Sequence, residues 1–332
     1  MGEGHTIPLD RSRWLKTSDL LDRQIIFLDL NFWIGLTEGT TADFRELERV
    51  LSEAVTVGQV VCAVSPSLLL EVKKRPASAR RTQYCDLMDR LSCGLSLRQW
   101  QFVFADEFLC IIEDRKSERQ IAYSHFTEAL SSGTLIEWSN TPSAAEKDRA
   151  MQVIPEILYQ MTIRDFVNIE VPEHEEGSIS SLRAGLANLA KQEEEWREKF
   201  TDSRRDIEKA EFAATIRAVV PQIAELIPEL PSQLLEYLAS TSEEEKRELL
   251  DRCPSFHCNH KLVSALRTNR IRVRENDMWD TEHVVTALPY VDGFACDRGT
   301  RHLCSDVLQL DARFNTEVVS SAGKLINWIE RA

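Results

Sequence analysis

The chain has 332 residues, of which 43% are hydrophobic and 28% are charged, values that are normal for a protein with a packed core. No apolar run approaches the roughly 20 residues of a membrane-spanning helix, and the polar first residues do not resemble a signal peptide, so no membrane partner is expected. The net charge of −14 argues against general affinity for nucleic acid, and the eight cysteines do not make a disulfide scaffold in a chain of this size. We therefore expect a globular protein of the reducing cytoplasm.

The first predicted element is a buried strand that ends in a carboxylate. Residues 24–30 are almost wholly apolar, which is typical of a strand buried on both faces of a parallel sheet. Asp29 falls near the carboxyl end of this run, where an ionised side chain is costly to bury unless it is paired or bound to a metal. Asn31 follows and could orient Asp29 through a side-chain hydrogen bond. Because α/β sheets bind ligands beyond the carboxyl ends of their strands, Asp29 is the first candidate site residue.

A second buried strand is predicted over 59–64, after an amphipathic helix over 40–55. Ser65 and Pro66 are typical of a helix start, because serine caps a helix and proline suits its first turn. Glu71 would then lie near the amino end of this helix, among apolar residues. The pattern of strand, turn and carboxylate thus recurs.

The pattern from residue 97 to residue 252 is largely helical, with one helix predicted over 119–131. Residues 171–252 hold 19 acidic and 11 basic side chains, which accounts for more than half of the net charge. Because strands are predicted before and after this region, we expect residues 1–96 and 253–332 to form one domain in two parts and 97–252 to be an all-helical insertion. The acidic insertion is a candidate surface for a protein partner, and a homo-oligomer is left open.

A short apolar helix is predicted after residue 276, and Pro289 stops it. Asp277, with Asp280 three residues later, resembles a capping box, so we favour a helix cap over a ligand role for Asp277. His283 lies on the same helix face as Asp280 and could hydrogen-bond a carboxylate or a phosphate, although a packed helix histidine is an equally common outcome. Asp280 is therefore a further candidate site residue, with His283 in support.

A third buried strand is predicted over 291–296, with Asp297 at its carboxyl end. Asp292 begins this strand and is a weaker candidate for the site. A last strand over 313–319 and a closing helix over 320–331 complete the predicted α/β unit.

The segments that carry these carboxylates resemble the PIN-domain nucleases. The similar stretches read FLDLNFWIGL, SPSLLLE and NDMWDTEHVVTALPYVDGFACD, and they contain Asp29, Glu71, Asp280 and Asp297. The resemblance covers roughly residues 1–95 and 253–332, and it implies a three-layer α/β/α fold around a central, mostly parallel sheet. It also implies that the four carboxylates are catalytic and hold one or two divalent cations, Mg²⁺ or Mn²⁺. Ala295 and Cys296 stand where PIN proteins often carry Thr or Ser, so no hydroxyl is available there.

Basic side chains flank the candidate carboxylates despite the acidic total. The nucleic-acid-binding candidates among them are Lys73, Lys74, Arg75, Arg274 and Arg298. Phosphate contacts need local rather than global positive charge, although solvated helix ends explain any single cluster equally well. Aromatic side chains near the site could stack on unpaired bases, but such residues more often belong to the core: Phe32, Trp33, Trp279 and Tyr290.

The function that these patterns favour is a metal-dependent endoribonuclease of a toxin or defence system. RNA is expected ahead of single-stranded or flap DNA as the nucleic-acid partner. Two alternatives stay open: a PIN-like interaction or regulatory protein without catalytic activity, and a phosphatase that acts on small phosphate esters. The presence of all four carboxylates argues against the first, and the basic clusters are unnecessary for the second.

Overall fold

The computed structural model describes residues 20, 22–76, 78–126, 129, 161–168, 251–268 and 275–331, and single residues at 212, 232, 236, 242, 245 and 248. For residues 267, 268 and 275–278 it describes the backbone and not the side chains. Most of the predicted insertion, 97–252, lies outside the described residues, as does Arg274. The predicted division into domains and the role of the insertion as a partner surface therefore stay predictions.

A four-stranded parallel sheet forms the centre of the described part of the chain. Its strands are, in spatial order, β2 (Val60–Ala63), β1 (Gln24–Leu28), β5 (Gly293–Ala295) and β6 (Glu317–Val319). Ile26 of β1 lies beside Cys62 of β2 on one side and beside Gly293 of β5 on the other. Every residue of β2, and every residue of β1 after Gln24, is buried, as the apolar runs predict. Strands from the two ends of the chain thus form one sheet, which confirms the predicted α/β fold with a parallel sheet.

Helices follow most of the strands. The first part of the chain contains α1 (Leu30–Glu38), α2 (Ala42–Thr56), α3 (Pro66–Lys73), α4 (Ala79–Ser92) and α5 (Trp100–Ile112). The later helices are α8 (Ile163–Asn168), α13 (Pro254–Thr268), α14 (Glu275–Ala287), α15 (Arg298–Arg301), α16 (Leu310–Phe314) and α17 (Ala322–Ile329). None of the helices in the described ranges is long and apolar enough to cross a membrane.

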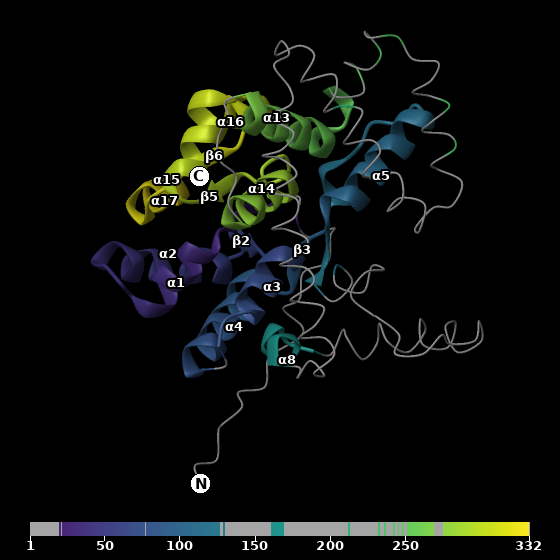
Figure 1. Ribbon diagram of the computed structural model, residues 1–332. Coiled ribbons are helices and arrows are strands. Elements are labelled where there is room, and N and C mark those ends of the chain that lie inside the picture. The colour runs from purple at the N-terminus through teal and green to yellow at the C-terminus, as the bar shows by residue number, and fades with distance from the viewer. Residues whose placement is uncertain are drawn as a thin grey trace, which may run out of the picture.

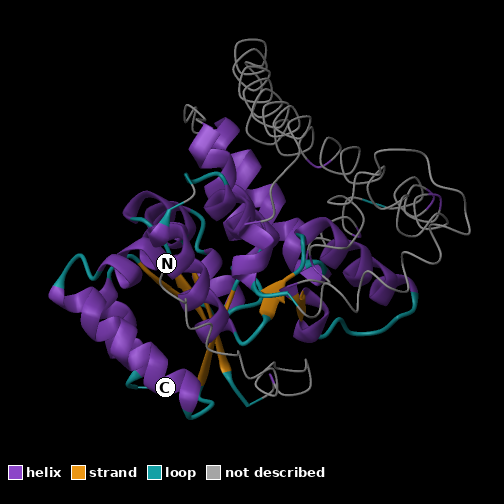
Figure 2. Cartoon of the chain, turned by 90° about the horizontal axis from the view of Figure 1, so that it is seen from below, coloured by secondary structure: helices purple, strands orange, loops and turns teal. Residues whose placement is uncertain are grey.

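Helices that are far apart in the sequence lie side by side in the structure (Figure 1). In particular, α17 packs against α2, and α14 packs against α3. Figure 2 shows helices on both sides of the strands. The arrangement is compatible with the predicted three-layer α/β/α architecture, and it brings α14, which carries Asp280, against α3, which carries Glu71.

Side-chain caps fix where several of these helices begin. The hydroxyl of Ser65 accepts a hydrogen bond from the backbone N–H of Leu68, and Pro66 occupies the first turn of α3, as predicted. Thr41 caps α2 in the same way through the N–H of Phe44. The helix that the sequence places over 40–55 therefore begins only after its cap, at Ala42.

The start of the predicted insertion is not all helical. Residues 119–131 were expected to form one helix, but Arg119–Ala122 is a short 3₁₀-helix and Tyr123–His125 is strand β4. This strand pairs antiparallel with β3 (Leu95–Leu97), which in turn hydrogen-bonds Val64 at the end of β2. The helix prediction was wrong because pairing with β3 outweighs the local helical pattern. The last strand is also shorter than predicted, since residue 313 belongs to α16 and β6 begins at Glu317.

Asp292 anchors the amino-terminal end of β5. Both of its carboxylate oxygens accept hydrogen bonds from the Arg119 guanidinium, at 2.9 and 2.8 Å, and one of them also accepts from the backbone N–H of Ile25 at 2.7 Å. Asp292 thus has a structural role at the end of the strand opposite to Asp297.

Glu107 joins α5 to the carboxyl-terminal part of the chain. Its side chain is 1% exposed and accepts hydrogen bonds from the hydroxyls of Ser255 at 2.5 Å and Tyr290 at 2.6 Å. Burial raises the pKa of Glu107 from 4.5 to about 7. The folded protein therefore holds this proton more tightly than the unfolded chain does.

Replacement of Glu107 by Gln is expected to stabilise the protein above pH 7. The contribution of the raised pKa is fully present below about pH 4.5 and is lost as the pH rises through about 7, whereas Gln stays neutral throughout. The gain in unfolding free energy should be larger at pH 8 than at pH 5 by about 2 kcal/mol. Urea unfolding at both pH values measures it, with Glu330→Gln on the surface as the control. An equal effect of Glu107→Gln at both pH values would show that the pKa of Glu107 is not raised in the folded protein.

Candidate metal centre

Asp29 lies where β1 ends and α1 begins. It is 6% exposed, and its Oδ1 accepts a hydrogen bond from the backbone N–H of Leu30 at 2.7 Å. The Asn31 amide donates to the other oxygen at 3.1 Å, so the predicted orienting hydrogen bond is present. Burial alone would raise the pKa of Asp29, but the neighbouring His283 and these two hydrogen bonds hold it below its usual value. Asp29 is therefore held as a carboxylate with a fixed orientation.

Glu71 reaches the same place from α3. It is the sixth residue of an eight-residue helix, so it lies nearer the carboxyl end of that helix than the sequence suggested. Burial raises the pKa of Glu71, and the nearby charges of Arg75 and Lys74 partly offset this. Its Oε2 is buried and has no hydrogen-bond partner among the described residues.

His283 lies between these two carboxylates. Its side chain is 2% exposed; Nδ1 is 3.5 Å from Oδ1 of Asp29 and Nε2 is 3.9 Å from Oε2 of Glu71. The ring also packs against Phe27 of β1, with 5.5 Å between ring centroids. The neighbouring carboxylates raise the pKa of His283 against the opposing effect of burial. The sequence indicated only a supporting role for His283, because its position facing two carboxylates depends on α14 packing against α3 and β1.

These three side chains together could hold a metal ion. One ligand atom from each of Asp29, Glu71 and His283 lies within 4.8 Å of the others. Both ring nitrogens of His283 and Oε2 of Glu71 are buried without a hydrogen-bond partner among the described residues. Buried polar atoms are normally bonded, so unpartnered atoms that face one another fit a site for a cation. This geometry meets the requirement for a metal site, and it does not identify the metal.

Asp280 and Asp297 lie close to this group. Burial, followed by the negative charges of Asp29 and Asp297, raises the pKa of Asp280 to about 7. Asp297 follows β5 and caps α15, accepting hydrogen bonds from the backbone N–H groups of Gly299 at 2.6 Å and Thr300 at 3.1 Å. The Thr300 hydroxyl donates to its other oxygen at 2.6 Å. The structure thus gathers all four predicted carboxylates beside the carboxyl ends of the strands. Asp297 is oriented by the helix that it caps.

Asp277 does not cap α14. The helix already begins at Glu275, so Asp277 lies within its first turn, and the predicted boundary was wrong by at least two residues. An acidic residue in a first turn still favours the helix through the helix dipole. The side chain of Asp277 is outside the described part of the structure.

The basic candidates that the structure describes occupy two places. The Nζ of Lys74 lies 3.6 Å from the ring centroid of Trp279, and that of Lys73 lies 5.2 Å from the ring of Phe166. Arg75 follows at the end of α3, and Arg298 is exposed at the start of α15. The pair of Lys74 and Arg75 therefore lies close to Glu71, whose charge it partly offsets.

The aromatic side chains proposed for base stacking are mostly part of the core. Phe32 is 4% exposed, Trp33 is fully buried and Tyr290 is 4% exposed. The core was the favoured expectation for these side chains, and the burial of these three agrees with it. Trp279 is half-buried and lies under the ammonium group of Lys74.

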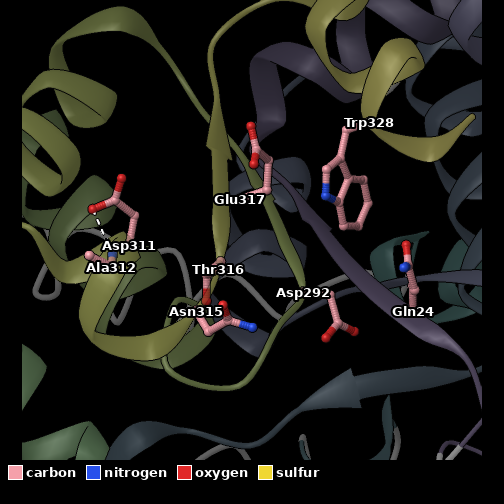
Figure 3. A pocket seen from close by; sticks show the side chains of 8 residues that line it. All are labelled: Gln24, Asp292, Asp311, Ala312, Asn315, Thr316, Glu317 and Trp328. Carbon is pink, nitrogen blue, oxygen red and sulfur yellow. Dashed lines mark hydrogen bonds between the residues drawn. The ribbon is translucent and has the colours of Figure 1, made fainter. Parts of the chain in front are cut away.

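Two of the cavities formed by the described residues lie at opposite ends of the strands. One, of about 310 Å³, is lined by Asp280 and Asp297 and therefore adjoins the candidate metal centre. The other, of about 430 Å³, is shown in Figure 3, and its lining includes Gln24, Asp292 and Glu317, at the amino-terminal ends of β1, β5 and β6. This second cavity is remote from the four carboxylates, and the Asp292 in its wall is already paired with Arg119.

Comparison of the chain with protein-family models, curated proteins and solved structures found no match. The resemblance to PIN-domain nucleases therefore stays a prediction.

Proposed function

We propose that the chain is a divalent-metal-dependent endonuclease that hydrolyses phosphodiester bonds, with RNA as its preferred substrate and a toxin or defence role. The observation that carries the proposal is the buried group of Asp29, Glu71 and His283, whose facing ligand atoms lie within 4.8 Å of one another. Two further carboxylates, Asp280 and Asp297, adjoin this group and line an open cavity. Carboxylates gathered at the carboxyl ends of parallel strands are well placed to act on a bound ligand.

The residues of the chain have distinct roles in this proposal. Asp29, Glu71 and His283 would hold a divalent cation, which would lower the pKa of a bound water and offset the charge that develops on a phosphate. Asp29 is held as a carboxylate by Leu30 and Asn31, so it offers an oriented ligand oxygen. His283, with its raised pKa, balances the charge of Asp29 and Glu71 when it is protonated and must release that proton to act as a ligand. Asp280 and Asp297 adjoin the centre on the side of the cavity, where the substrate would approach.

The mixed ligand set favours Mn²⁺ over Mg²⁺. Carboxylate oxygens suit both ions, whereas an imidazole nitrogen suits transition metals and is a poor ligand for Mg²⁺. We therefore expect Mn²⁺ to bind more tightly than Mg²⁺ to the native protein, and the difference to shrink in His283→Gln.

Cleavage of end-labelled single-stranded RNA and DNA tests the proposed function. With Mn²⁺ or Mg²⁺, internal cuts are expected in RNA and fewer in DNA, and EDTA should abolish them. A small phosphate monoester incubated in parallel tests the phosphatase alternative. If neither polymer is cut although the centre binds metal, the endonuclease proposal is wrong and a non-catalytic PIN-like role becomes the better explanation.

Replacement of both Lys74 and Arg75 by Gln is expected to weaken RNA binding without changing sequence preference. Each basic residue that contacts a phosphate releases counterions, so the double variant should lower the slope of log affinity against log salt by about 2. Fluorescence anisotropy of a labelled strand over a range of salt concentrations measures this. A double variant at Arg49 and Arg90, which are exposed on α2 and α4, is the matched control. Equal losses in the two double variants would show that the effect is one of total charge.

A further inference from the structure

The cavity beside Asp280 and Asp297 has a size and apolar walls that the binding of a metal ion and a phosphate does not require. Its volume is about 310 Å³, at the lower end of the range of about 300–1,000 Å³ that is typical of small-ligand sites. Three helical segments enclose it: α13, α14 and the residues that follow Asp297. Its size suits one nucleoside-sized group rather than a longer stretch of polymer.

The walls of this cavity are largely apolar. They include Leu266 of α13, Val284 of α14, and Leu303 and Val307 of the segment after α15. Val307 is 45% exposed, which makes it one of the few large hydrophobic side chains at the surface of the described residues. A metal-bound phosphate is polar and gains nothing from apolar walls, whereas the faces of a flat heterocycle can pack against them.

The backbone on one side of the cavity is unusual. Residues His302–Val307 form a π-helix directly after α15, and three of them, His302, Leu303 and Val307, line the cavity. π-helical turns are rare and occur frequently at functional sites. The turn gives the cavity the ring of His302, whose Nδ1 lies 2.8 Å from Oδ2 of Asp306, beside two aliphatic side chains. The wall therefore presents apolar side chains to the faces of a ring, with an imidazole beside them.

We propose that this cavity holds one unpaired nucleobase of the strand whose phosphate lies at the metal centre. The proposal rests on the proposed endonuclease function and assigns its substrate class, a strand with unpaired bases. The two carboxylates in the cavity wall adjoin the centre, so a base in the cavity would lie beside a phosphate at the centre. A base must leave a duplex to enter such a cavity, which excludes intact duplex as the preferred substrate.

Removal of single bases tests this proposal by binding and by cleavage. A labelled single-stranded RNA is compared with strands of the same sequence in which one nucleotide at a time lacks its base. Binding is measured by fluorescence anisotropy of the native chain in EDTA, so that the strand stays intact, and cleavage is measured with the native chain and Mn²⁺. Loss of one particular base is expected to lower affinity by about 5- to 100-fold, and loss of the others much less.

A larger side chain at the mouth of the cavity provides the second arm. Val307→Trp should reduce binding of the complete strand and remove its dependence on that one base. Val57→Trp is the matched control, because Val57 is also an exposed valine, 76% exposed, and does not line the cavity. Near-native unfolding temperatures of both variants establish that the fold is retained.

The outcomes separate this proposal from the proposed function. Base-dependent binding that Val307→Trp abolishes supports the nucleobase cavity, whether or not the strand is cut. Cleavage that is equally fast for every strand overturns the cavity proposal and leaves the endonuclease intact. Binding that depends on no single base, or a dependence that Val307→Trp leaves unchanged, also overturns it.

Discussion

Replacement of Asp29 by Asn is expected to abolish metal-dependent cleavage while leaving the fold intact. Asp29 belongs to the buried ligand group, and Asn removes both its charge and one ligand oxygen. Asn is as good a helix cap as Asp, so the bond that Asp29 accepts from the N–H of Leu30 at the start of α1 can be kept. Groups that only support metal ligands typically cost 10- to 100-fold when removed, so a loss of more than about 100-fold is expected here. Single-turnover cleavage of labelled RNA with Mn²⁺ measures it.

The control for Asp29→Asn is Asp43→Asn. Asp43 is exposed in the first turn of α2 and lies outside the ligand group, so the same change of charge there should leave cleavage unaltered. Unfolding curves of the two variants should be similar. Residual cleavage by Asp29→Asn within about tenfold of the native rate would show that Asp29 is not a metal ligand.

Addition of Mn²⁺ is expected to raise the unfolding temperature of the native chain and not that of Asp29→Asn. An ion that binds only the folded state stabilises it by about 2.7 kcal/mol when its concentration is 100 times Kd. For a chain of this length that corresponds to about 4 °C. Differential scanning calorimetry with Mn²⁺ and with EDTA measures the shift. An equal shift in both proteins would indicate that the ion binds elsewhere.

The rise in unfolding temperature that Mn²⁺ causes should depend on pH, in a direction set by Asp280 and His283. Burial and its acidic neighbours raise the pKa of Asp280 to about 7 from 3.8, and His283 also has a raised pKa. Without metal, this contribution of Asp280 to stability is present below about pH 4 and is lost as the pH rises through about 7. Metal binding needs His283 deprotonated and is favoured by the negative charge of Asp280, so the stabilisation by Mn²⁺ should be largest above about pH 8 and should decline as the pH falls below 7. A shift that is larger at pH 6 than at pH 8 would contradict this.

The parts of the fold that the sequence predicts are those with a local signal. The apolar run before Asp29 predicts β1 because a strand buried on both faces must be apolar throughout. Ser65 and Pro66 predict the start of α3 because capping is decided within one turn. The carboxylates Glu71 and Asp297 could be found because each follows such a strand closely along the chain.

The parts that the sequence does not predict depend on tertiary contacts. The strand β4 forms because β3 offers it an edge, and nothing in its own residues distinguishes it from a helix. His283 faces Asp29 and Glu71 only because α14 packs against α3, so its spacing from Asp280 indicates a shared helix face and no more.

The most direct test of the account is the position of a bound ion. Crystals of the native chain soaked in Mn²⁺ and measured at a wavelength where manganese scatters anomalously should give a difference peak in contact with Asp29, Glu71 and His283. Such a peak, absent from crystals of Asp29→Asn, is the result that the account predicts. A peak bound only elsewhere, or no peak at this group in a protein that cleaves RNA with Mn²⁺, would contradict it.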